Sequence, residues 1–276
     1  KTQLADLHND LGTCCAAEGQ YDQALAHGLE ALKVRQQCLA PDHPDVATSM
    51  NNIGETYRAQ GKYAEALDFQ QKALELRKQS LGEAHPDVAA SMNNIGMTYF
   101  EQGNYAEALD FQQKALELGK QSLGEAHPHV AAGMNNIGMT YFEQGKYVEA
   151  LDFQQKALEL RKQSIGEAHP AVATSMDNIG GTYLVQGKHA EALAIQQKAP
   201  ELRKQSLGEA HPDVATSMNN IGATYRAQGK YAEALKNQQA ALSLLRKLLG
   251  EEHPNTGHAR VNIGLTYLKL NDAKQG

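Results

Sequence analysis

PDVAASMNNIGMTYFEQGNYAEALDFQQKALELGKQSLGEAH, residues 86–127, is followed at once by a near copy of itself. The block 128–169 differs at only six of 42 positions, namely 87/129, 91/133, 104/146, 106/148, 119/161 and 123/165. His-Pro pairs keep the same 42-residue step at His43, His85, His127, His169, His211 and His253. Self-similarity at a fixed period of this length is typical of solenoids, in which each unit packs on its neighbours.

The period divides the 276 residues into a single repeat array. We expect six repeats at approximately 1–43, 44–85, 86–127, 128–169, 170–211 and 212–253, followed by a half repeat at 254–276. Residue 1 falls where a helix is already under way, so we expect the chain to be cut from a longer protein.

Each block is predicted to form two antiparallel helices. In block 44–85, Pro44 suits the first helical position, where no amide hydrogen is needed. Gly61 ends the first helix, because glycine adopts the left-handed cap conformation without a clash. Apolar residues at helical spacing then mark the buried stripes of both helices, at Val46, Met50, Ile53, Ala66, Leu67, Ala73, Leu74 and Leu81. The predicted fold class is all-α, a right-handed superhelical solenoid of about thirteen helices.

Two features depart from the expected pattern of a helical repeat. Pro200 stands in a column otherwise filled by leucine, and a proline inside a helix removes a hydrogen bond and clashes with the preceding turn. We therefore predict a kink near Gln196. Glutamines stand in a column where a large apolar residue is expected, at Gln70, Gln112, Gln154 and Gln196. We expect them to face solvent or a partner.

The small and aromatic residues that recur every 42 residues resemble the signature of a known repeat family. In block 44–85 Gly54, Tyr57, Gly61, Tyr63, Ala66 and Ala73 resemble the signature of the tetratricopeptide repeat. That repeat usually has 34 residues. The 42-residue unit, with its LGExHPDVA linker and NNIGxTY run, resembles the repeats of kinesin light chains. The resemblance covers the whole chain and implies a TPR-like scaffold that binds a protein or linear peptide in a concave groove lined by the first helices.

The resemblance also implies that one asparagine per repeat hydrogen-bonds the peptide main chain, since an amide both donates and accepts. The matching residues are Asn52, Asn94, Asn136, Asn178 and Asn220. Asn51, Asn93 and Asn135 lie beside them on the same predicted face. Alternatively, these amides bond to one another or cap neighbouring carbonyls.

Large apolar residues are predicted on the open face of the middle first helices. They are Met97, Phe100, Met139, Phe142 and Leu184, with Arg58 and Arg226 at either end of the series. Large apolar residues on a solvent-exposed face often indicate an interaction surface. We predict a groove with an apolar floor and cationic ends, which takes apolar anchors with acidic flanks. The alternatives are partial core packing and drift after duplication.

Composition and missing motifs narrow the function further. A net charge of −6 disfavours nucleic acid, and no apolar run is long enough for a membrane span. The low cysteine count and the lack of a secretory segment predict a cytoplasmic location. No phosphate loop or nucleophile motif indicates an enzyme or a cofactor. Equivalent histidines of successive repeats are expected too far apart to share one zinc ion, so no metal site is predicted.

Two other functions remain open at this point. Near-identical repeats could stack head to tail into a self-associating structural array. The chain could also be the sensor or adaptor segment of a larger signalling or motor-cargo protein.

Overall fold

The computed structural model describes residues 2–275, which fold into helices and short connections. The helices form two compact units, one ending at Gln144 and one beginning at Gly145, and each unit is described separately. The first unit contains α1 (Thr2–Ala17), α2 (Tyr21–Cys38), α3 (Pro44–Ala59), α4 (Tyr63–Leu81), α5 (Pro86–Glu101), α6 (Tyr105–Leu123) and α7 (Pro128–Glu143).

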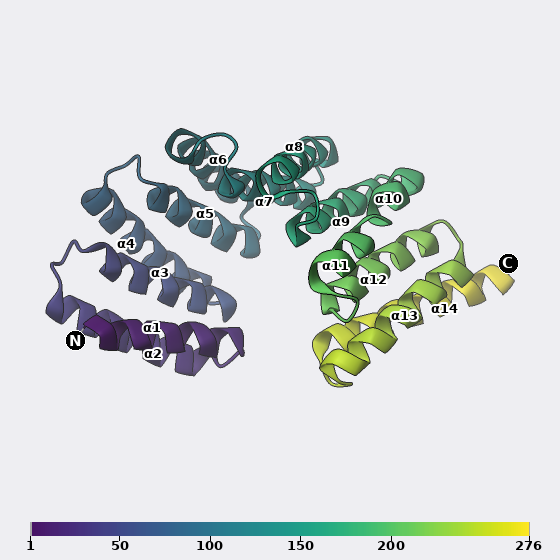
Figure 1. The fold of residues 1–276 in the computed structure, drawn as a ribbon, viewed down its shortest axis with the longest axis horizontal. Helices are drawn as coiled ribbons and strands as arrows, with labels where there is room; N and C mark the ends of the chain where they lie inside the picture. Colours follow the sequence, from purple (N-terminus) through teal and green to yellow (C-terminus); the bar gives the residue numbers. More distant parts are fainter. Residues whose placement is uncertain (1, 276) are drawn as a thin grey trace. The chain divides into compact units, whose positions relative to one another are not determined.

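The second unit continues the same alternation of helices. It contains α8 (Tyr147–Ile165), α9 (Pro170–Val185), α10 (His189–Gln196), α11 (Ala199–Leu207), α12 (Pro212–Ala227), α13 (Tyr231–Leu249) and α14 (Pro254–Gln275). Within each unit every hairpin lies against the next, as Figure 1 shows. The predicted all-α array of helix hairpins is confirmed.

Local sequence signals set the helix ends. Six first helices begin at the proline of a His-Pro pair; α3, for example, begins at Pro44. The Nδ1 atom of His43 accepts a hydrogen bond from the Asp45 amide at 3.2 Å and so caps α3. Gly61 and Gly82, with φ of 73° and 87°, follow the ends of α3 and α4 in a conformation that disfavours a side chain. In α14, Asn271 replaces the glycine of that column and the helix continues.

A small apolar layer joins each hairpin to the next. Leu74 of α4 packs on Val88 and Ile95 of α5, and the same trio recurs one repeat earlier. All three side chains are buried. Burial of one such side chain stabilises a fold by about 1.5–3 kcal/mol, so the array is held together by neighbour interfaces.

The glutamine column is buried, and the prediction that it faces solvent is wrong. Gln70, at 0% exposure, accepts a hydrogen bond from the Thr98 hydroxyl of the next repeat at 2.8 Å. The glutamine fits because a glycine lies opposite: a Cβ on Gly54 would come within 2.7 Å of the Gln70 Cγ atom. The same glutamine–threonine bond recurs in both units, at Gln112–Thr140, Gln154–Thr182, Gln196–Thr224 and Gln238–Thr266.

The predicted kink at Pro200 is confirmed. α10 ends at Gln196 and α11 begins at Ala199, where every other full repeat has one continuous second helix. The break raises the number of helices in residues 2–275 from the expected thirteen to fourteen. Pro200 itself is buried, so its neighbours hold the broken helix in place.

Candidate functional site

The first helices form the inner side of each unit. In the first unit α1, α3, α5 and α7 approach one another in series, whereas α2, α4 and α6 make no close backbone contact with each other. In the second unit α9, α12 and α14 likewise approach one another. Helices that touch lie on the inside of a curve and helices that diverge lie on its outside, so the first helices line the concave face of each unit.

The two asparagine columns pair along this face in the first unit. Asn94 donates from Nδ2 to Asn51 Oδ1 at 3.1 Å, and Asn136 donates to Asn93 in the same way. Asn52 donates to Asn9 at 2.9 Å. In the second unit, Asn220 donates to the carboxylate of Asp177, which stands in the first column. In the first unit the amides of these pairs therefore bond to one another, as one of the alternatives expected.

The pairing uses only part of each amide. Asn52, Asn94 and Asn136 are half-buried, and each donates one of its two amide hydrogens to the preceding repeat. Within residues 2–275 their Oδ1 atoms accept no hydrogen bond. A row of three oriented acceptors with adjacent N–H donors therefore lies along the inner face of the first unit.

The predicted apolar floor is half-buried. In the first unit Met97 accepts a weak hydrogen bond from Gln112, and the Phe100 ring lies 5.9 Å from that of Tyr105. Met139 accepts one from Asn135. Phe142 is also half-buried, as is Leu184 in the second unit. These side chains both support their hairpins and leave apolar surface on the face.

The two flanking arginines are already engaged. Arg58 forms ion pairs with Glu55 at 2.6 Å and with Glu101. Burial alone would lower the pKa of the Arg58 guanidinium, but these two carboxylates raise it above its ordinary value. Arg226 donates to the main-chain oxygen of Asn262 at 3.3 Å. The positive charge of Arg58 is thus neutralised within the first unit.

A second recurring device, missed by the sequence analysis, connects the outer and inner helices. An arginine near the end of a second helix reaches the next first helix, where it donates to a serine hydroxyl and a main-chain oxygen. Arg77 contacts Ser91 Oγ at 2.7 Å and the Asp87 oxygen at 3.3 Å. The same two contacts recur at Arg35, Arg161 and Arg203. We call the column that holds these residues the arginine position.

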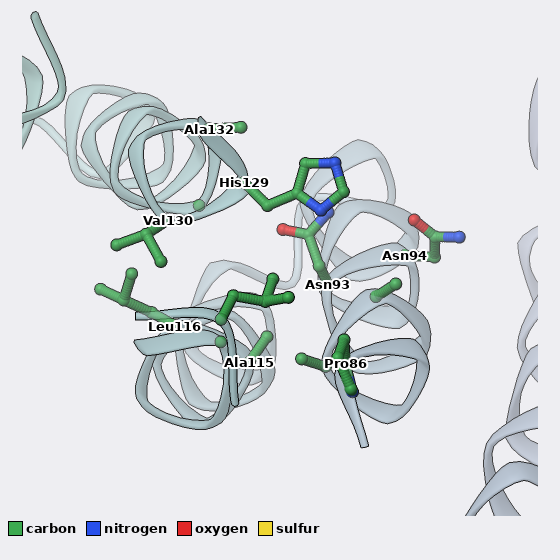
Figure 2. Close-up of a pocket in the computed structure, with 13 residues that line it drawn as sticks. Pro86, Asn93, Asn94, Ala115, Leu116, His129, Val130 and Ala132 are labelled. Carbon is green, nitrogen blue, oxygen red and sulfur yellow. The ribbon is translucent and has the colours of Figure 1, made fainter. Parts of the chain in front are cut away.

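Both members of this contact are missing where the third repeat meets the fourth. Gly119 occupies the arginine position and Gly133 replaces the serine. Between α5, α6 and α7 a cavity of about 220 Å³ remains, which we call the Gly119 cavity. Figure 2 shows Leu116 and Val130 on one side of it and Asn93 and His129 on the other.

The Gly119 cavity opens beside the asparagine row. Its floor at Gly119 is buried, whereas Ala90 and His129 on its rim are exposed. Asn94, a member of the row, lies at its edge. A Cβ atom on Gly119 would meet nothing closer than a Val130 methyl at 3.9 Å, so the space is free of tight contacts.

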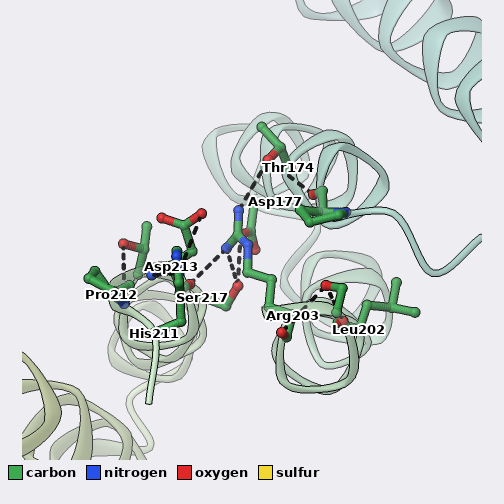
Figure 3. A network of polar contacts seen from close by, with 11 residues as sticks. Thr174, Asp177, Leu202, Arg203, His211, Pro212, Asp213 and Ser217 are labelled. Atoms are coloured by element: carbon green, nitrogen blue, oxygen red, sulfur yellow. Dashed lines mark hydrogen bonds and ion pairs between the residues drawn. The ribbon is translucent and has the colours of Figure 1, made fainter. Parts of the chain in front are cut away.

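The arginine position is most elaborate at Arg203, in the second unit. Its guanidinium donates to Asp177 Oδ2 at 2.6 Å, to Thr174 at 3.2 Å and to Ser217, as Figure 3 shows. Burial raises the pKa of the Asp177 carboxyl, against the opposing effect of Arg203. Elsewhere in the column, burial lowers the pKa of Arg77 and Arg161.

The repeated histidines have a structural role. In each His-Pro pair the imidazole Nδ1 accepts from the amide two residues on, at 3.1–3.2 Å. Among residues 2–275 no group of three His, Cys, Asp or Glu side chains is placed to hold a metal ion. In the same range no helix is both long and apolar enough to cross a membrane.

Comparison with known proteins identifies the family. The tetratricopeptide repeat model matches residues 3–79, 57–121, 87–163, 129–205, 171–246 and 213–275. The chain belongs to the tetratricopeptide repeat family. No match to it was found among curated proteins.

Several solved structures share this tetratricopeptide fold. The nearly identical TPR-like repeats of a candidate kinesin light chain from Podosopora anserina match with a TM-score of 0.64 and 20% identity, over 75% of this chain and 98% of that one. BtubC (BKLC) from P. vanneervenii gives 0.67 and 21%, over 91% and 93%. A Rap protein in complex with competence and sporulation factor gives 0.61 and 15%, over 96% and 75%. At these identities the likeness concerns the fold.

Proposed function

We propose that this tetratricopeptide protein is a cytoplasmic, non-catalytic scaffold whose concave face binds an extended segment of a partner protein. The observation that carries the proposal is the row Asn52, Asn94 and Asn136. Each side chain is held by a bond to the preceding repeat and keeps one N–H and its Oδ1 for another group. Donor and acceptor at every step match the main chain of an extended peptide, which also presents both.

The neighbouring side chains would supply the remaining affinity. Met97, Phe100, Met139 and Phe142 are half-buried on the same helices and offer apolar surface to a partner's side chains. In the second unit Leu184 lies on α9 and Arg226 lies on α12, and there they would offer an apolar and a cationic side chain to a partner. Ordering an extended segment offsets much of the contact energy, so we expect micromolar affinity.

A peptide-display selection against the intact chain tests this proposal. The same selection is run on Asn94→Ala, Asn136→Ala, which removes two members of the row. The matched control is Gln71→Ala, Gln121→Ala, which makes two equivalent truncations at exposed positions of α4 and α6. Enriched peptides should bind the control as well as the parent and bind the asparagine variant at least tenfold more weakly. Equal binding to both variants would contradict the proposal.

The end helices favour a second candidate, head-to-tail self-association. Leu4, Leu7 and Leu11 of α1 are 40–55% exposed, and Val261 and Leu268 of α14 are about 60% exposed. Large exposed apolar faces of this kind mark interaction surfaces. Light scattering over a hundredfold range of concentration distinguishes the candidates. A mass that rises with concentration, and falls back in Leu7→Lys, would favour stacking; a constant monomer mass would exclude it.

A further inference from the structure

The Gly119 cavity has a close internal precedent. In four other repeats the equivalent space is filled by a guanidinium group of the chain itself, from Arg35, Arg77, Arg161 and Arg203. The lining is the same set of positions in each repeat, because the columns repeat every 42 residues. The backbone around the Gly119 cavity is therefore the same as the backbone that surrounds a guanidinium group in the four other repeats.

Acceptors for a guanidinium remain at the cavity. The main-chain oxygen of His129 corresponds to the oxygens of Asp87, Ala171 and Asp213, each of which accepts from an arginine at 3.0–3.3 Å. Asn93 corresponds to Asp177, which accepts from Arg203. The Asn93 Oδ1 atom accepts one bond from Asn136 and has a second lone pair.

Among residues 2–275 no lysine or arginine lines the Gly119 cavity, so no permanent positive charge of the lining repels a cation. The chain carries a net charge of −6, and Arg58, the cation expected to select acidic flanks, is paired with Glu55 and Glu101. Helix N-termini, such as that of α7 here, by themselves favour anions. At the equivalent position of four other repeats an arginine nevertheless donates to a main-chain oxygen at the start of the next first helix. There the carbonyl oxygen outweighs the preference of the helix N-terminus for an anion.

We propose that the Gly119 cavity binds a guanidinium group, and that its occupant is an arginine side chain of the partner segment. The second half of this statement rests on the proposed function, because it requires a segment on the concave face. Asn94 connects the two sites, since it belongs to the asparagine row and lies at the edge of the cavity. An arginine from a segment on the row would insert its head between Asn93 and the His129 oxygen, above the apolar floor at Leu116.

Saturation-transfer NMR on the intact chain tests the chemistry of the cavity without a peptide. The probe is N-methylguanidinium at low millimolar concentration, compared with neutral N-methylurea of the same shape and with acetate. The control variant is Gly119→Arg, Gly133→Ser, which restores the arrangement of the other repeats and fills the space. Circular dichroism checks that this variant is folded.

We expect saturable binding of methylguanidinium, at least tenfold weaker binding of the urea and of acetate, and loss of transfer in the filled variant. Equal binding of the urea, preference for acetate, or unchanged transfer in the filled variant would overturn the proposal.

Peptides from the display selection separate this inference from the proposed function. Enriched peptides should contain an arginine whose replacement by citrulline weakens binding at least tenfold to the parent but not to the filled variant. Peptides that bind through the asparagine row without any arginine would leave the scaffold function standing and refute the arginine occupant. Binding of methylguanidinium with no enriched peptide would refute the scaffold function and, with it, the partner's arginine.

Discussion

The Gly119 cavity of the first unit and the Arg203 network of the second are the same place in two different repeats. At Arg203 a guanidinium crosses from α11 to Asp177 of α9 and Ser217 of α12. At Gly119 the arginine and the serine are both glycine, and open space remains. The backbone frame is shared, since His127 and His211 both cap the following helix.

The difference shows where a repeat array can vary. The apolar layer and the glutamine–threonine bond recur in both units and hold adjacent repeats together. The arginine position is a brace added to this frame, so it can be lost without loss of the fold. A site at a single junction between two repeats can therefore arise by removal of two side chains.

Opening the second site is the most damaging change we predict. Arg203→Gly, Ser217→Gly should lower the free energy of unfolding by about 3–5 kcal/mol, because it leaves the buried Asp177 carboxylate without its cation. Urea unfolding followed by far-UV circular dichroism measures the loss.

The control for this change is the triple variant that also carries Asp177→Asn. Asparagine occupies this column in the second to fourth repeats, so the triple variant should recover a good part of the loss. A double variant as stable as the parent would show that the brace contributes nothing.

Closing the first site should have a smaller effect of opposite sign. Gly119→Arg, Gly133→Ser should raise the free energy of unfolding by about 1–2 kcal/mol, since glycine inside a helix costs about 1 kcal/mol against better helix formers. A Cβ atom added at Gly119 would meet only a Val130 methyl at 3.9 Å, so the first atom of the new side chain fits. A thermal melt measures the gain, and a fall in melting temperature would mean that the cavity is not the shape of the missing arginine.

The helix hairpins that the two regions share were predictable from the sequence, whereas the side-chain contacts between repeats were not. Proline and glycine positions fix the helix ends locally, so the hairpins and the break at Pro200 followed directly. The burial of Gln70 did not, because the hydroxyl that donates to its amide oxygen belongs to Thr98 and the room for its side chain is left by Gly54, both in other helices. A glutamine can be buried in an apolar column if its amide has a hydrogen-bond partner, and the sequence did not show that partner.

The Gly119 cavity was overlooked for a related reason. Positions 91/133 and 119/161 are among the six that differ between two adjacent blocks, and the sequence alone does not show that they meet. Gly119 lies at the end of one block and Gly133 at the start of the next, and only the fold brings them to one cavity. The asparagine pairs likewise join successive repeats, 43 residues apart.

The histidine caps test whether the two regions share one frame. His127→Ala at the cavity and His211→Ala at the network should each cost about 1 kcal/mol, a typical value for the loss of a helix cap. His127→Asn and His211→Asn keep a capping acceptor and should cost less. Thermal melts of the four variants check this, and a loss confined to one region would show that the frames differ.

The smallest effect is expected at Asp177, a carboxylate in the second region that corresponds to the neutral Asn93 in the first. Burial raises the pKa of this carboxyl above its ordinary value of 3.8. The folded state then binds the proton more tightly than the unfolded state, so this group's contribution to stability falls as the pH rises above 3.8.

Asp177→Asn removes this contribution. Arg203 keeps its hydrogen bonds to Ser217 and to the Asp213 oxygen in the variant, because Arg77 makes the equivalent two bonds in a repeat that has Asn51 at this position. Relative to the parent, the variant should therefore gain stability, on the order of 1 kcal/mol, as the pH rises from below 3.8 toward neutrality. Urea midpoints for both chains across this range give the difference directly. A relative loss as the pH rises would mean that the ion pair with Arg203 prevails over burial and lowers the pKa of Asp177.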